Sequence, residues 1–176
     1  MPSDLAPLIL TALLPKDLHS WATNLRDQHF PAERNFLQAH VTLFHALPPQ
    51  YAGEIASLCK QMAGELAPID AELRGVMQLG KGTALKLESD ALLALRDNIA
   101  EHFHGLLTGQ DQHRPRLHIT IQNKVSIEAA KALQAELADF VEPRLFQFRG
   151  LGLYRYRGGP WEKTGEYVFR GRGNAF

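Results

Sequence analysis

The sequence HVTLFHAL, residues 40–47, is matched later in the chain by HITIQNKV, residues 118–125. Each segment begins with histidine, an apolar residue, threonine and a second apolar residue, in a run whose composition predicts a strand. Because side chains alternate across a strand, His40, Thr42 and Phe44 are predicted to share one face, opposite the apolar residues between them. The apolar face is the expected core, so the face with histidine and threonine is the candidate site.

The elements around the two motifs also repeat. The pattern around the first motif predicts strand, helix, strand, helix, strand, and the same order follows around the second. Gly150 follows Gly75 by 75 positions, and the sequences around the two glycines are similar. We therefore predict one α+β domain over residues 1–176, made of two similar lobes with an internal repeat of roughly 8–82 and 83–170. Equivalent residues of such a repeat face each other across a pseudo-two-fold axis, so the two motif histidines are expected to share a cleft.

Composition narrows the class of protein. Lys plus Arg and Asp plus Glu number 19 each, and this balance argues against a protein that coats long nucleic acid such as DNA. The single cysteine, Cys59, makes an internal disulfide impossible and a Cys-rich metal site implausible, as expected in a reducing compartment. The apolar run near the N-terminus is too short to span a bilayer. We expect a cytoplasmic monomer with no metal and no membrane partner.

Two imidazoles that face one pocket are suited to cleaving a phosphodiester without a metal. With ordinary pKa values of about 6.5, one neutral ring can accept a proton while the other, protonated, donates one, which predicts a bell-shaped pH–rate profile around neutrality. The hydroxyls of Thr42 and Thr120 and the amine of Lys124 can bind the non-bridging oxygens. His40 and His118 are therefore the candidate catalytic residues.

The paired HVTL and HITI words in a duplicated α+β chain resemble the two-histidine (2H) phosphoesterase superfamily, and within it the 2′-5′ RNA ligase-like proteins. This resemblance implies a LigT-like bilobal fold, with two antiparallel sheets flanked by helices around a central cleft. It implies action on 2′,3′-cyclic phosphate or 2′-5′-linked RNA ends, without metal, ATP or another cofactor. It casts His118 as the base for water and His40 as the acid for the 3′ oxygen, with the roles exchanged in ligation.

The resemblance also implies that Thr42 and Thr120 bind the phosphate. Many relatives place an arginine shortly after the second motif, where this chain has Lys124, a cation of different geometry. The expected function is thus a 2H phosphodiesterase that hydrolyses a 2′,3′-cyclic phosphate on an RNA end or a small cyclic nucleotide, with ligation as the reverse reaction. The alternative is a non-catalytic module that binds RNA ends or nucleotides in the same cleft.

Aromatic and basic residues outside the motifs are further candidates for RNA contacts. The candidates for stacking on a base are Phe44, Tyr154, Tyr156 and Trp161. Arg155 could meet a flanking phosphate, and for each residue a structural role in the core or rim is the alternative. His45 is predicted to point away from the motif face and to be structural.

One further segment, GVMQLGKG at 75–82, nearly matches a phosphate-binding loop. It has glycine where that loop needs serine or threonine, and a strand pattern follows it, so we predict a hairpin turn.

Overall fold

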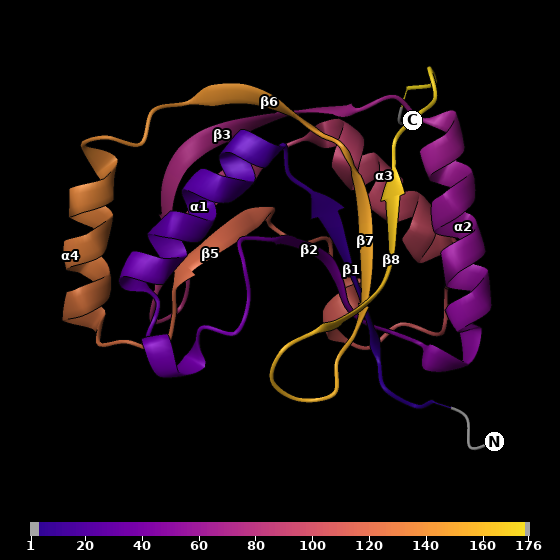
Figure 1. Cartoon of the computed structure of the whole chain (residues 1–176), viewed down its shortest axis with the longest axis horizontal. Helices are drawn as coiled ribbons and strands as arrows, with labels where there is room; N and C mark the ends of the chain where they lie inside the picture. The colour runs from indigo at the N-terminus through magenta and orange to yellow at the C-terminus, as the bar shows by residue number, and fades with distance from the viewer. Residues whose placement is uncertain (1–3, 175–176) are drawn as a thin grey trace.

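Within residues 4–174, which the computed structural model describes, eight strands form two four-stranded antiparallel sheets with four α-helices packed on them (Figure 1). The first sheet has the order β2-β1-β7-β8 and the second β5-β4-β3-β6. The strands are β1 (Leu8–Leu13), β2 (Val41–Leu47), β3 (Ile69–Gln78), β4 (Thr83–Glu88), β5 (His118–Gln122), β6 (Arg144–Phe148), β7 (Gly150–Arg155) and β8 (Glu162–Val168). The α-helices are α1 (Lys16–His29), α2 (Ala52–Glu65), α3 (Asp90–His102) and α4 (Ile127–Ala138). The predicted α+β class with two antiparallel sheets is confirmed.

The two sheets correspond strand by strand. The motif strands β2 and β5 each occupy an edge, next to β1 and β4, the strands that open the two halves of the chain. Strands of each half cross to the sheet of the other half: β3 pairs with β4, and β7 pairs with β1. Each sheet is therefore built from both halves, and the sequence boundary near residue 83 does not separate the sheets. The repeat of 8–82 and 83–170 stays a prediction from the sequence.

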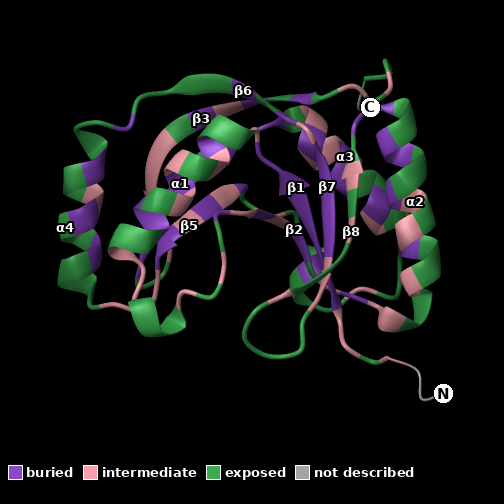
Figure 2. Ribbon diagram, in the orientation of Figure 1, coloured by how far each residue is buried: buried purple, intermediate pink, exposed green. Residues whose placement is uncertain are grey.

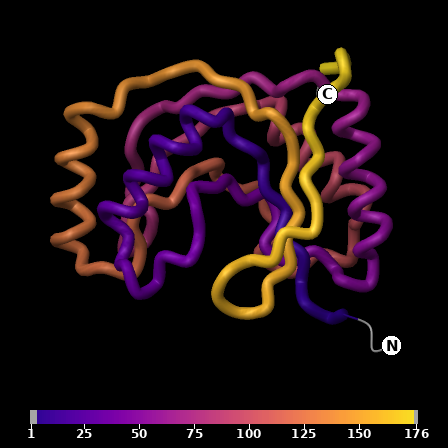
Figure 3. The backbone as a smooth tube through the Cα atoms, viewed as in Figure 1, coloured from indigo at the N-terminus to yellow at the C-terminus, as the bar shows by residue number. Residues whose placement is uncertain are grey.

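The crossing between sheets divides a segment that reads as one strand, RLFQFRGLGLYRYR from residue 144. The structure breaks it at Arg149 into β6, in the second sheet, and β7, in the first, and Figure 3 shows this part of the chain passing from one sheet to the other. The Arg149 backbone N–H donates to Leu13 O at 2.9 Å, and its Nε donates to Leu14 O at 3.0 Å. These bonds attach the crossing point to the end of β1.

The helices bury apolar stripes against the sheets, while most of their outer faces are exposed (Figure 2). Helix α1 contacts β5, α2 contacts β7 and β8, α3 contacts β3, and α4 contacts β3 and β4. All six residues of β1 are buried. At the start of α3, the Ser89 hydroxyl accepts a hydrogen bond from Leu92 N at 3.1 Å and caps the helix. No helix in the described part of the chain is long and apolar enough to cross a membrane.

Each motif strand contains a β-bulge directly after its threonine. Thr11 of β1 pairs with Thr42, but the preceding residue of β1 pairs with Phe44, so Leu43 is an extra residue in β2. The same shift between β4 and β5 makes Ile121 an extra residue after Thr120. A bulge reverses the alternation of side chains beyond it. The motif face predicted by strict alternation therefore ends at the threonine in both strands.

The segment 75–82 ends in a hairpin turn, as predicted. The strand β3 continues to Gln78, Leu79 N donates to Gly82 O at 3.1 Å, and β4 returns antiparallel. A Cβ on Gly82 would lie 2.0 Å from Gln122 O, so the close approach of β5 requires glycine here. A strand follows this turn instead of the helix that a phosphate-binding loop needs.

Candidate functional site

The two motif strands come from different sheets and contact each other. His40 immediately precedes β2 and His118 opens β5, so both imidazoles lie at the same end of their motif strands. The contact between the two strands therefore brings the two motifs into one region of the molecule.

The two imidazoles are oriented by equivalent hydrogen bonds. His40 Nδ1 lies 2.8 Å from Gln38 O, and His118 Nδ1 lies 2.6 Å from Arg116 O. In each case the partner is the backbone carbonyl two residues earlier. A carbonyl oxygen only accepts, so each Nδ1 carries a proton, and in the neutral ring Nε2 has the free lone pair. Both histidines thus present Nε2 for proton transfer.

The protonation of His40 differs from that of a solvated histidine. Burial lowers the pKa of His40 to about 4, with smaller contributions in the same direction from the charges of Arg26, His118 and His45. The hydrogen bond to Gln38 O acts in the opposite direction. His40 is therefore neutral at pH 7 and is suited to accept a proton.

The motif threonines are half-buried, next to the histidines of their strands. Thr42 pairs across the sheet with Thr11, a buried residue whose hydroxyl donates to Gly152 O at 3.4 Å. Thr120 pairs with Ala84. Lys124 lies in the loop after β5 with a φ of 56°, and its carbonyl accepts a hydrogen bond of 3.3 Å from Arg34 Nη2. The Lys124 side chain is exposed.

Phe44 does not lie on the motif face, contrary to the prediction from strict alternation, and it has the structural role that was the alternative to a base contact. Its side chain is 0% exposed, and the guanidinium of Arg96 lies 4.2 Å from the centre of its ring. The physical reason is the bulge at Leu43, which turns Phe44 into the core instead of onto the face of Thr42. Phe44 is therefore a core residue, and a base cannot stack on it.

The same bulge changes the placement of His45. Its side chain is exposed, and its backbone N–H donates to Asp111 at 2.9 Å. Burial lowers the pKa of His45 first, followed by the charges of His118 and Arg96, while the carboxylate of Asp111 raises it. Beyond the bulge, His45 thus lies on the face of Thr42, which the strict alternation did not predict.

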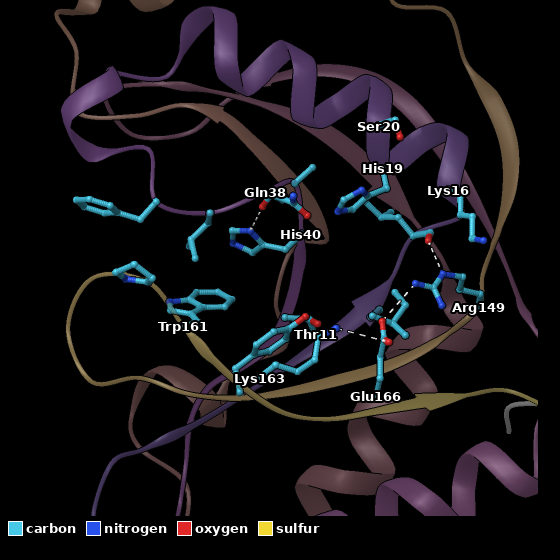
Figure 4. Close-up of a pocket in the computed structure, with 18 residues that line it drawn as sticks. Thr11, Lys16, His19, Ser20, Gln38, His40, Arg149, Trp161, Lys163 and Glu166 are labelled. Carbon is cyan, nitrogen blue, oxygen red and sulfur yellow. Dashed lines mark hydrogen bonds and ion pairs between the residues drawn. The ribbon is translucent and has the colours of Figure 1, made fainter.

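A cavity of about 570 Å³ opens beside His40 (Figure 4). At one end Trp161 packs edge-on against His40, with ring centres 4.7 Å apart, and Tyr154 lies 5.7 Å from Trp161. Three positively charged residues also line it: Lys16 from the first turn of α1, Arg149 and Lys163. Trp161 was predicted from the sequence, whereas these cations were not. The volume is in the range of pockets that hold a small-molecule ligand.

Of the predicted site residues, only His40, Tyr154 and Trp161 line this cavity within residues 4–174, and the others, including His118, lie outside it. Tyr156 is 46% exposed just beyond β7, and its backbone N–H donates to Pro7 O at 3.0 Å. Arg155 forms an ion pair with Asp4, with Nε 3.5 Å from the carboxylate. Both residues therefore lie at the end of the first sheet where the chain enters β1. Of the two candidate tyrosines, Tyr154 lines the cavity and Tyr156 does not.

A buried arginine joins the two motif segments. Arg26 on α1 is 2% exposed, and its Nη1 donates to Thr120 O at 2.8 Å. Its Nε donates to Leu37 O at 3.2 Å and its Nη2 to Asn35 Oδ1 at 3.1 Å, both in the segment that leads into the first motif. In the sequence Arg26 resembles an ordinary charge on a helix surface, and only the tertiary structure distinguishes it.

Arg96 on α3 holds the other motif strand. It is 3% exposed, its Nε donates to Leu43 O at 3.3 Å, and its Nη2 bonds to the Asp111 carbonyl. The Asp111 carboxylate also accepts from the backbone N–H groups of His45 and Ala46. Each motif strand is thus bound at or beside its bulge by a buried arginine from the other half of the chain.

Metal ligands are not gathered at this site. Across residues 4–174 there is no group of three or more His, Cys, Asp or Glu side chains placed to hold a metal ion. The donors that line the cavity beside His40 include hydroxyls and cationic nitrogens, which are groups suited to an anionic phosphate.

The two sheets and their paired histidine motifs are those of a two-histidine phosphoesterase. The family model of the 2′-5′ RNA ligase superfamily matches residues 14–160, and the chain belongs to this superfamily. No curated protein matches the chain by sequence.

Several solved structures share the fold. The protein TT0787 of Thermus thermophilus is similar with a TM-score of 0.63 and 18% identity, over 95% of this chain and 100% of that one. E. coli LigT complexed with NADP+ gives a TM-score of 0.56 and 16% identity, over 94% of this chain and 99% of that one. E. coli LigT complexed with 3′-AMP gives a TM-score of 0.53 and 16% identity over the same shares. The LigT-like architecture is therefore confirmed over nearly the whole chain.

Proposed function

We propose that the protein is a phosphodiesterase that hydrolyses 2′,3′-cyclic phosphates on RNA ends or small nucleotides by paired-histidine catalysis, without a metal. The observation that carries the proposal is the equivalent orientation of His40 and His118 by carbonyls two residues earlier. The contact between their strands supports a shared reaction site. The solved complexes of similarly folded E. coli LigT with 3′-AMP, ATP and phosphate support a nucleotide phosphate as ligand.

In the proposed reaction, Nε2 of one histidine takes a proton from water as its oxygen attacks the phosphorus. The bond from phosphorus to the 3′ oxygen breaks, and the second histidine donates its Nε2 proton to that oxygen, leaving a 2′-phosphate. The low pKa of His40 supports it as the base, which leaves His118 as the acid. This is the reverse of the assignment that the family resemblance implies. Ligation is the same path backwards, with a ribose 5′-hydroxyl in place of water.

The charge on the non-bridging oxygens needs donors that persist through the transition state. Thr42 and Thr120 are proposed to supply hydroxyl donors, because each follows its histidine by two residues and remains partly accessible. Lys124 is proposed to contribute positive charge from the loop after β5. Trp161, packed on His40, is the proposed contact for the base or sugar of the nucleotide.

The test uses an oligonucleotide that ends in a 2′,3′-cyclic phosphate, incubated with the protein in the presence of a chelator. We expect hydrolysis, and a loss of about 10²- to 10⁴-fold in rate for His40→Ala and for His118→Ala. Binding without turnover by the unaltered protein would instead support the non-catalytic RNA-end module. Turnover that requires an added metal ion would contradict the proposed mechanism.

A further inference from the structure

The cavity beside His40 carries more positive charge than a single reacting phosphate needs. Lys16, Arg149 and Lys163 line it, and among the described residues Glu166 is the one carboxylate on its wall. Glu166 lies 3.3 Å from Arg149 Nη2 and 3.6 Å from Lys163 Nζ, so this one negative charge is shared by two cations. Within residues 4–174 no carboxylate lies in ion-pair distance of Lys16. In this part of the chain, the cavity thus has a net positive charge and a lysine available to bind an anion.

The two ends of the cavity differ in chemical character. Its aromatic end, Trp161 and Tyr154, is beside the proposed catalytic imidazole of His40, and Lys16 and Arg149 are grouped away from Trp161 (Figure 4). A flat apolar platform followed by cations matches a nucleoside followed by a phosphate. In a nucleoside 2′,3′-cyclic phosphate, the 5′ carbon is on the opposite side of the sugar from the reacting 2′ and 3′ oxygens. A second phosphate that extends away from His40 is therefore a 5′-phosphate.

We propose that this cavity is a subsite for the nucleoside that bears the cyclic phosphate and for its 5′-phosphate, with Lys16 and Arg149 as the phosphate-binding residues. This inference rests on the proposed function, because it takes His40 as the reaction centre. It narrows the substrate class to a 5′-phosphorylated nucleoside 2′,3′-cyclic phosphate, which is the terminal nucleotide of an RNA chain. A cyclic nucleotide with a free 5′-hydroxyl is then a poorer substrate.

The experiment compares adenosine 2′,3′-cyclic phosphate with the same compound carrying a 5′-phosphate. We expect kcat/KM to be about tenfold higher for the phosphorylated compound, the effect of one charge-assisted hydrogen bond. This ratio should fall in Lys16→Ala, which retains Arg149, and fall further in Lys16→Glu, whatever happens to the absolute rates. Lys60→Ala, an exposed lysine on α2 outside the cavity, is the matched control and should keep the ratio.

A binding measurement separates the failure of this inference from the failure of the proposed function. Calorimetry with adenosine 5′-monophosphate and adenosine tests the subsite without any turnover, and the monophosphate should bind more tightly in a manner that depends on Lys16. If kcat/KM is equal for the two cyclic compounds and the ratio is unchanged in Lys16→Glu, the 5′-phosphate subsite is refuted while the proposed phosphodiesterase activity is not. Tight binding that depends on Lys16, without hydrolysis of either cyclic compound, would support the subsite and refute the proposed phosphodiesterase activity.

Discussion

Arg26 Nη1 donates a hydrogen bond of 2.8 Å to the carbonyl oxygen of Thr120, so a side chain from the first half of the chain holds the backbone of the second motif. The same guanidinium bonds to Leu37 O, three residues before His40. Although burial lowers the pKa of Arg26 to about 10, the group is still charged at pH 7. Arg26 therefore fixes the two motif segments relative to each other and adds positive charge near His40.

Replacement of Arg26 should separate these two effects. Arg26→Met leaves buried carbonyl acceptors without a donor, so we expect unfolding in urea to show a loss of about 3 kcal/mol. It also removes one of the charges that lower the pKa of His40, so this pKa should rise from about 4 in an NMR titration. Arg26→Lys keeps the positive charge but loses the planar guanidinium that donates to several acceptors. The pKa of His40 should therefore rise less in Arg26→Lys than in Arg26→Met.

Catalysis gives a second readout for Arg26 as a positioning residue. We expect a fall in kcat of at least about tenfold in Arg26→Met, with a smaller change in KM, because the distance between the two imidazoles is no longer fixed. Arg170→Met, an exposed arginine near the C-terminus, serves as the control. A variant that is destabilised but keeps its kcat and the His40 pKa would show that Arg26 is only structural.

The pH dependence of kcat/KM distinguishes the two possible roles of His40. With its pKa near 4, His40 is neutral over most of the accessible range and loses base activity only as pH falls through about 4. The acidic limb of the profile should therefore lie near pH 4, lower than the profile around neutrality that unperturbed imidazoles predict. If His40 were the acid, activity would already decline as pH rises above about 4, and the protein would be nearly inactive at pH 7.

The same low pKa makes folding stability depend on pH. Between an unfolded value of about 6.5 and the folded value of about 4, the unfolded state binds more protons at residue 40 than the folded state does. The contribution of His40 to stability is therefore complete above pH 6.5 and decreases as pH falls to 4. In urea titrations, His40→Gln should lose less stability over this interval than the unaltered protein.

A control is needed for this stability measurement because burial also lowers the pKa values of His19 and His45. These residues titrate in both the unaltered protein and His40→Gln, so the difference between the two proteins isolates His40. His104→Gln changes an exposed histidine beyond α3 and should follow the unaltered protein. An identical pH dependence in His40→Gln would refute the low pKa.

Much of the architecture follows from local sequence patterns, while the tertiary contacts of the site do not. Alternating and helical periodicities predict the strands and helices, and the repeated His-x-Thr words identify the paired motif strands. The bulges after Thr42 and Thr120 depend on the register with β1 and β4, which no single strand specifies.

The charged residues of the site are harder to recognise for a related reason. Arg26 and Lys16 both have the sequence character of solvated helix residues, yet one is 2% exposed between the motifs and the other lines the cavity. Arg149 lies inside a segment with the pattern of one continuous strand, and its position becomes special only because the chain changes sheets there. Long-range packing, which is not encoded in any local period, decides these three placements.

Variants of Phe44 and Trp161 test which aromatic side chain contacts the nucleotide. Both were candidates for a base contact, and the structure places only Trp161 at the cavity. Phe44 packs beneath Arg96 in the core, so Phe44→Leu should destabilise the protein by about 1 kcal/mol or more and leave KM unchanged. Trp161→Leu should raise KM by about 5- to 100-fold, the effect of losing one stacked base, with little loss of stability. Urea unfolding and steady-state kinetics on both variants measure the two quantities. A raised KM in Phe44→Leu with normal stability would mean that the β2 bulge is absent in solution and that Phe44 faces the nucleotide after all.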